Sequence, residues 1–242
     1  MRNFYEWLVT LIGAIYFVLS GLLLSLLSLF VRPFLNEQQA NKLGRYSMHY
    51  ISRLFFAGLR LSGLVTTNFS ELDKLRHERG IIITPNHPGL MDALYISSRL
   101  PNVVCVMKAS VIKNPILFGA AWLGGFIQSD SATQLTKQCQ HSLEAGAQLL
   151  LFPEGTRTIH RPINPFKGGF ALIARNSAAP IQTVFIKTSN QFLGKHWKLL
   201  QKPDFPLNYQ VQLGERFSVD KNQNHRNFTR DLEHYFTQQL TK

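Results

Sequence analysis

The stretch GIIITPNHPGLMD, residues 80–92, joins a uniformly apolar run to a turn that carries His87 and Asp92. The run IIIT predicts a strand that is covered on both faces, because a strand with one face in water would alternate apolar and polar residues. Pro88 favours an extended backbone at His87, and Gly89 permits a sharp turn into a helix that starts near Asp92. The stretch therefore predicts a buried strand, a loop and a helix in succession, which is typical of an α/β fold.

Similar apolar runs continue on the carboxyl side of this stretch. Strands are predicted for NVVCVM, AQLLLFPEG, PIQTVFIK and YQVQLGERF, a helix for residues 133–147 and a closing helix for residues 227–240. We therefore expect residues 66–242 to form one α/β domain with a central, mostly parallel, covered sheet flanked by helices.

The first 65 residues differ from the rest of the chain in their pattern of apolar and charged residues. Residues 7–31 contain no charged side chain and are long enough for a helix to cross a hydrocarbon layer of about 30 Å. Residues 45–65 repeat apolar side chains at near-helical spacing, with Arg53 and Arg60 placed to reach lipid headgroups. A spanning helix, a hairpin in one leaflet and a buried helical pair all fit this pattern. We expect residues 1–65 to be a membrane-associated helical region.

Charge and cysteine content narrow the class of protein. The 26 Lys and Arg residues against 14 Asp and Glu give a formal net charge of +12, which favours a polyanionic partner. The basic residues are dispersed and no recognition or stacking motif appears, so we expect no nucleic acid partner. Most basic residues follow residues 7–31, so if this segment spans the membrane we expect the bulk of the chain on the cytoplasmic side of the inner (plasma) membrane. Cys105 and Cys139 have no neighbour at ligand spacing, so we expect neither a metal nor a disulfide.

The turn between His87 and Asp92 can serve acid–base chemistry. If the chain folds back there, Asp92 accepts a hydrogen bond from one imidazole nitrogen and leaves the other nitrogen as a base. The loop contains no Ser, Thr or Cys as an evident nucleophile, so the base would act on a substrate hydroxyl. The alternative is a loop histidine held by a carboxylate that only caps the helix.

A second charged turn follows the predicted strand at residues 149–157, LLLFPEGTR. Glu154 and Arg157 lie where the carboxyl ends of strands line a site in open α/β sheets. Further along, Lys167 precedes two glycines that allow backbone to approach a ligand. Arg157 and Lys167 could hold an anionic headgroup or phosphate, and the alternative is a Glu154–Arg157 salt bridge in an ordinary turn.

Together, NHPGLMD and, some way downstream, FPEGTR resemble the glycerolipid acyltransferases typified by 1-acylglycerol-3-phosphate acyltransferase. The resemblance covers residues 64–217 and includes VMKAS, with Lys108. It implies a membrane-associated enzyme that moves a fatty acyl group from acyl-CoA or acyl carrier protein to the hydroxyl of a lysolipid acceptor, without a metal or bound cofactor. It implies His87 as general base and Asp92 as its orienting partner. The substrate-binding residues it implies are Glu154, Gly155, Thr156, Arg157, Lys167 and Lys108.

One block departs from that family pattern. Enzymes of this kind usually carry an arginine shortly after the segment that corresponds to GGFIQSDS, whereas no Lys or Arg occurs here between Lys113 and Lys137. Asp130 or Ser131 stands in that place, and either suits a hydroxyl or ammonium group better than a phosphate. The acceptor is therefore expected to be lysophosphatidate or a related lysophospholipid, with a non-phosphate lipid such as an amino-acid lipid or glycolipid as the alternative. A catalytically silent protein that binds lipids or acyl carrier protein is the other alternative.

Overall fold

The computed structural model describes residues 1–130, 132–190, 192–198 and 201–241. Within them, strands form a seven-stranded sheet in the order β1-β7-β6-β2-β5-β3-β4. Every neighbouring pair is parallel except β6 and β7, which are antiparallel. The predicted mostly parallel sheet is confirmed. The strands are β1 (Val65–Asn68), β2 (Ile81–Pro85), β3 (Val103–Met107), β4 (Ile127–Gln128), β5 (Gln148–Leu150), β6 (Ile181–Thr188) and β7 (Leu207–Phe217).

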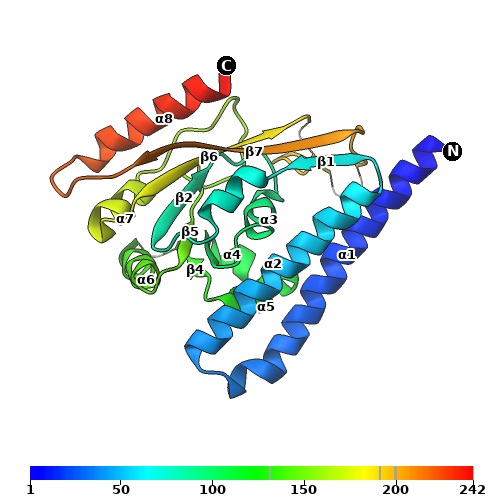
Figure 1. The fold of residues 1–242 in the computed structure, drawn as a ribbon, viewed down its shortest axis with the longest axis horizontal. Coiled ribbons are helices and arrows are strands. Elements are labelled where there is room, and N and C mark those ends of the chain that lie inside the picture. Colours follow the sequence, from blue (N-terminus) through cyan, green and yellow to red (C-terminus); the bar gives the residue numbers. More distant parts are fainter. Residues whose placement is uncertain (131, 191, 199–200, 242) are drawn as a thin grey trace.

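Helices cover both faces of the sheet (Figure 1). One face carries α2 (Glu37–Leu61), α3 (Asp92–Ser97), the 3-10 helix Ser70–Leu75 and α5 (Pro115–Gly124), whose side chains share one apolar cluster with the sheet. The other face carries α6 (Ala132–Glu144), α7 (Gly169–Ser177) and α8 (His225–Thr241), which enclose a second cluster. This double cover explains why β2 is buried at every position and reads as a continuous apolar run.

The helix predicted over residues 133–147 is α6, and it ends earlier than the pattern indicates. Gly146 adopts a φ of +81°, a left-handed backbone conformation in which glycine commonly ends a helix. The backbone N–H of Ala147 donates to the carbonyl of Ser142, so the chain turns directly into β5. The predicted helix over residues 227–240 lies within α8.

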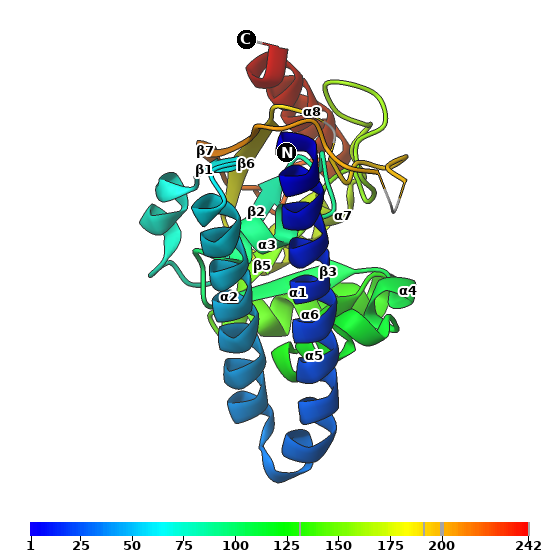
Figure 2. The ribbon, with the colours of Figure 1, turned by 90° about the vertical axis from the view of Figure 1, so that its right-hand side faces the viewer.

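The N-terminal region is a helical hairpin. Helix α1 (Arg2–Val31) and α2 lie side by side and are joined by the short helix Arg32–Phe34, as Figure 2 shows. Asn36 begins α2 with reciprocal hydrogen bonds to Gln39, an arrangement that satisfies two otherwise unpaired backbone donors. Residues 2–34 are the one segment in the described chain long and apolar enough to cross a membrane, judged by length and composition alone.

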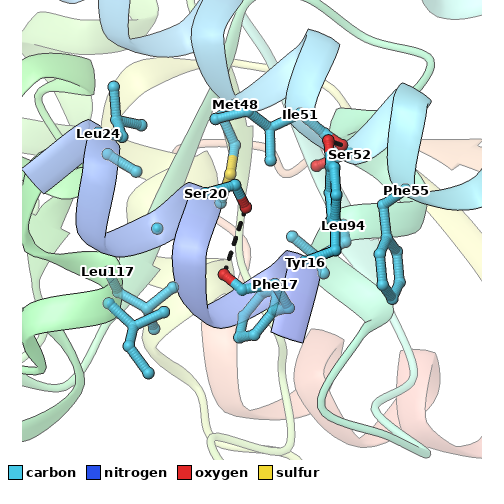
Figure 3. Close-up of a pocket in the computed structure, with 13 residues that line it drawn as sticks. Tyr16, Phe17, Ser20, Leu24, Met48, Ile51, Ser52, Phe55, Leu94 and Leu117 are labelled. Carbon is cyan, nitrogen blue, oxygen red and sulfur yellow. Dashed lines mark hydrogen bonds between the residues drawn. The ribbon is translucent and has the colours of Figure 1, made fainter. Parts of the chain in front are cut away.

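Small residues bring α1 against α5. Gly119 lies so close to α1 that an added Cβ would be 2.5 Å from Ser25 Cα, and its N–H donates to Ser25 Oγ at 2.8 Å. Ser25 Oγ in turn donates to the carbonyl of Pro115 at 2.6 Å. Nearby, an apolar cavity of about 20 Å³ remains between α1, α2 and α5, with Phe17 and Met48 in its wall (Figure 3). The hairpin is thus packed onto the α/β domain and not merely tethered to it.

Candidate active site

The carboxyl ends of β2 and β5 lie beside each other and bring the two charged turns together. Asn86, the first residue after β2, is buried and fixes the loop to β6. Its side-chain amide donates to the carbonyl of Ile186 at 3.0 Å, and its carbonyl oxygen accepts from the Ile186 N–H at 2.7 Å. His87 therefore starts its turn from an anchored backbone.

Asp92 folds back beneath the imidazole as the turn predicts. Its Oδ2 lies 2.8 Å from His87 Nδ1 and accepts a hydrogen bond from the Gly89 N–H at 2.9 Å. Burial raises the pKa of this fully enclosed carboxyl group, and the hydrogen bond from His87 opposes that rise. Among the described residues, none hydrogen-bonds the second imidazole nitrogen, Nε2. The ring is thus oriented on one edge and open on the other.

Phe152 supports the face of the imidazole. Its ring stacks on that of His87 with centroids 3.9 Å apart and an interplanar angle of 21°. This contact restricts rotation of the histidine side chain, since the ring is held by Asp92 at one edge and by Phe152 on one face. Sequence reasoning did not single out Phe152, although it belongs to the FPEGTR motif.

Glu154 joins the two motifs through the backbone. Its carboxylate accepts from the His87 N–H at 2.8 Å, the Asn164 N–H at 2.8 Å and the Thr158 hydroxyl at 2.9 Å. The Thr158 N–H also donates to the carbonyl of His87 at 2.7 Å. Glu154 is only 1% exposed, and burial raises its pKa against the opposing effect of these hydrogen bonds. The carboxylate points inward, so its evident work is to position the loop of His87.

Arg157 also faces the protein. Its Nη1 donates to the carbonyls of Leu193 and Gly194, both at 2.9 Å. The alternative of a Glu154–Arg157 salt bridge does not occur among the described salt bridges. Burial raises the pKa of Asp92, and the charge of Arg157 is the smallest of several effects that oppose this rise. Its hydrogen bonds hold a loop after β6 against the FPEGTR turn.

Gly155 and Lys167 lie against each other. Gly155 has a φ of +66°, and a Cβ added there would meet the Lys167 side chain at 2.9 Å. The backbone conformation favours glycine here, whereas the flexible end of the Lys167 side chain could move aside for a larger residue. Thr156 Oγ1 accepts a hydrogen bond from Lys195 Nζ at 3.4 Å. Gly155 and Thr156 lie in one turn, and the Lys167 N–H donates to the Pro153 carbonyl of that turn at 2.8 Å.

Lys108 is not part of this group. It lies at the carboxyl end of β3, two strands from β2, and is exposed just before α4 (Ala109–Ile112). Asp130, after β4, is also exposed, and its Oδ2 accepts a hydrogen bond from the Ala109 N–H at 3.1 Å. Ser131, the other residue predicted to replace the expected arginine, lies outside the described residues.

Among the described residues, no group of three or more His, Cys, Asp or Glu side chains is arranged so that it could hold a metal ion. Cys105 and Cys139 are buried free thiols in the two apolar clusters. Burial raises the pKa of each thiol to about 12, so both side chains serve as small apolar residues.

Comparison with known proteins shows which family this chain resembles. A chloroplastic 1-acyl-sn-glycerol-3-phosphate acyltransferase of Brassica napus is 22% identical over 60% of this chain and 44% of its own length. A 1-acyl-sn-glycerol-3-phosphate acyltransferase of Helicobacter pylori is 30% identical over 45% of this chain and 48% of its own. The chain thus spans about half the length of the curated relatives it matches.

A solved structure shares the fold. The 1-acyl-sn-glycerophosphate acyltransferase PlsC of Thermotoga maritima superposes with a TM-score of 0.69 and 18% identity, covering 100% of this chain and 97% of the other. The family model described as Acyltransferase matches residues 66–187, which is half of the chain and includes both charged turns. The resemblance noted from NHPGLMD and FPEGTR is confirmed, and the chain belongs to the glycerolipid acyltransferase family.

Proposed function

We propose that the protein transfers a fatty acyl group from a thioester donor, acyl-CoA or acyl carrier protein, to the hydroxyl of a lysolipid acceptor. One observation carries the proposal. His87 Nδ1 lies 2.8 Å from the buried Asp92 carboxylate while Nε2 is left open, which is the arrangement of a base held in one tautomer. The family and its curated relatives support the reaction class.

The acyl transfer requires few groups besides His87 and Asp92. A thioester is already activated, so Nε2 of His87 removes the proton from the acceptor hydroxyl as its oxygen bonds to the thioester carbon. The carbon–sulfur bond then breaks, and the departing thiolate takes the proton from the imidazolium. Asp92 stabilises the imidazolium between the two events, and Glu154 keeps the His87 backbone in place.

The hairpin would bring this site to the membrane. Large apolar side chains of α1 such as Leu11, Leu19 and Phe30 are exposed. The helix is held to the domain at both ends, by a Glu6–Lys202 ion pair near its start and by Ser25 against α5. A helix of this length, about 45 Å, cannot cross the bilayer without carrying the attached domain into it. We therefore place the hairpin in one leaflet, with the domain on the cytoplasmic side, where the net charge of +12 favours anionic lipids.

The acceptor headgroup has two candidates. The relatives are named as 1-acyl-sn-glycerol-3-phosphate acyltransferases, which favours lysophosphatidate. Asp130 favours a non-phosphate acceptor, because a carboxylate at the carboxyl end of β4 repels phosphate. In the lysophosphatidate case, the phosphate would depend on Arg157, Lys167 or Lys108.

The deciding experiment follows labelled acyl groups from acyl-CoA and from acyl carrier protein to a panel of lysolipids. The panel includes lysophosphatidate and amino-acid, glycolipid and zwitterionic acceptors. His87→Ala is expected to lower the rate by a factor of about 100 to 10,000 while membrane binding persists. The matched control is His141→Ala, which removes an exposed imidazole of α6. Retention of more than about a hundredth of the rate in His87→Ala would remove His87 as the base. Absence of transfer by the wild type to every acceptor would favour the lipid-binding alternative.

A further inference from the structure

A groove of about 820 Å³ opens beside the His87 loop. Asn86 and Pro88, the residues on either side of His87, form part of its wall, and Thr158 of the second motif forms another part. A volume of this size matches sites that take an organic ligand of moderate length. Asn86 and Pro88 flank His87 in sequence, so a molecule bound in the groove lies beside the loop that carries this histidine.

The wall of the groove is basic. Lys187 at the end of β6, together with Lys195 and His196 in the following loop, contributes exposed side chains, and Arg161 also lines it. Among the described residues that line the groove, none is Asp or Glu. The chemistry of the wall thus suits a ligand that carries phosphate.

The loop that bears Lys195 is fixed to the catalytic motifs. Arg157 donates to the carbonyls of Leu193 and Gly194, and the Leu90 N–H donates to the Leu193 carbonyl at 3.0 Å. Leu193 adopts a φ of +57°, a conformation that is uncommon outside glycine. Lys195 Nζ also reaches Thr156 Oγ1. Lys195 therefore lies beside the turn of the second motif, on a loop that Leu90 and Arg157 fix.

The position of the groove favours the water-soluble substrate over the lipid. Leu240 and Thr241 at the end of α8 form one border, and α8 packs on the sheet face opposite the α1–α2 hairpin (Figure 1). The Gln201 side of the groove adjoins the start of α1 through the neighbouring Glu6–Lys202 ion pair, whereas the α8 border lies away from the hairpin. The donor comes from water, and Trp197 and Ile159 provide apolar surface along the same groove.

We propose that this basic groove binds the phosphorylated pantetheine arm of the thioester donor. Lys187 and Lys195 pair with its phosphate, and the arm runs along the groove so that the thioester reaches His87 past Pro88 and Thr158. This assignment rests on the proposed acyl transfer. The shared chemistry is the pantetheine phosphate, which acyl-CoA and acyl carrier protein both contain.

The test is a paired charge reversal, Lys187→Glu with Lys195→Glu, assayed with three donors that carry the same acyl chain. The donors are acyl-CoA, acyl carrier protein and an acyl-pantetheine that lacks the phosphate. We expect the KM for the phosphorylated donors to rise about 30-fold or more, because two charge-assisted contacts become repulsive. The KM for acyl-pantetheine and for the acceptor is expected to change less than about twofold, since neither depends on those contacts. A rise with acyl-CoA alone or with acyl carrier protein alone identifies that molecule as the source of the phosphate.

The control is Lys221→Glu with Arg230→Glu, two exposed residues outside the groove that change the net charge by the same amount. Equal KM increases in both double variants would mean that overall charge, and not the groove, attracts the donor, which overturns the proposal. It is also overturned if the KM for acyl-pantetheine rises as much as that for acyl-CoA, or if only the acceptor KM rises. Lys187→Gln with Lys195→Gln gives a milder change if the reversal fails to fold.

A direct binding measurement separates this proposal from the proposed function. Calorimetric titration with coenzyme A needs no turnover, and we expect the charge reversal to weaken binding about 30-fold. Binding that weakens in the absence of any acyl transfer would uphold the groove and refute the reaction. Acyl transfer by the wild type, with coenzyme A binding unchanged by the charge reversal, would refute the groove and uphold the reaction.

Discussion

Replacing Glu154 by glutamine distinguishes two roles for this residue. The family resemblance suggested that Glu154 contacts the acceptor, whereas in the structure its carboxylate accepts hydrogen bonds from the His87 N–H, the Asn164 N–H and the Thr158 hydroxyl. In Glu154→Gln, one oxygen becomes an amide nitrogen, so at least one buried N–H faces another donor. A positioning role predicts that stability and catalysis fall together.

The magnitude follows from the contacts. A lost hydrogen bond to a charged group costs about 1.5–3 kcal/mol, and an unpaired buried donor costs about 1–3 kcal/mol. Part of this loss in stability is recovered, because the variant no longer buries a carboxylate whose pKa is raised by burial. The net loss is about 2–3 kcal/mol, which in a chain of this size lowers Tm by about 4–12 °C. Displacement of His87 should lower kcat by a further factor of about 10 to 100.

The assay combines thermal unfolding in detergent with acyl-transfer kinetics. Glu144→Gln, which alters an exposed carboxylate of α6, is the matched control and should leave both unchanged. A Glu154→Gln variant with an unaltered Tm and only a higher acceptor KM would refute the positioning role and restore the acceptor contact.

Three further predictions concern other parts of the molecule. Burial raises the pKa of Asp92, so the wild type loses stability as pH rises from the ordinary carboxyl value of about 4 toward the raised pKa of the folded state. Asp92→Asn has no such titration, so its Tm relative to wild type should increase as pH rises above about 4, although activity falls, and a difference that is constant with pH would contradict this. Cys105 and Cys139, with pKa values near 12, should resist maleimide for hours at pH 8 in the folded protein and react on unfolding, as mass spectrometry would show. Gly119→Val should separate α1 from α5, because an added Cβ lies 2.5 Å from the α1 backbone; we expect a loss of about 1–3 kcal/mol and faster proteolysis of the hairpin, with Gly58→Ala, which meets nothing within 4 Å, as the control.

Several features could be predicted because they depend on local pattern. The uniformly apolar run in β2 requires a strand covered on both faces, since its side chains leave no face for water. Pro88 and Gly89 permit the turn that places Asp92 beneath His87, and the two residues are close enough in sequence for the turn alone to join them. The apolar residues of α1 likewise indicate a helix that is long and apolar enough to cross a membrane, judged by length and composition alone.

Other features depend on contacts between distant segments, which no local pattern specifies. Nothing in the sequence of β7 shows that it pairs antiparallel with β6 while β1 lies parallel on its other edge, because strand order is decided by packing across the whole sheet. The sequence shows that Ser25 and Gly119 are small residues, but it does not show that they face each other.

The sequence by itself determined the α/β class, the family and the pairing of His87 with Asp92, because each rests on spacing within a short segment or on a motif. Only the tertiary structure decided what the second motif does. The sequence predicts Glu154 and Arg157 as substrate-binding residues, yet parallel strands bring them against the His87 loop and the loop after β6, where they form hydrogen bonds with backbone groups. A charged side chain that is buried must find such partners, and which partners it finds depends on the fold.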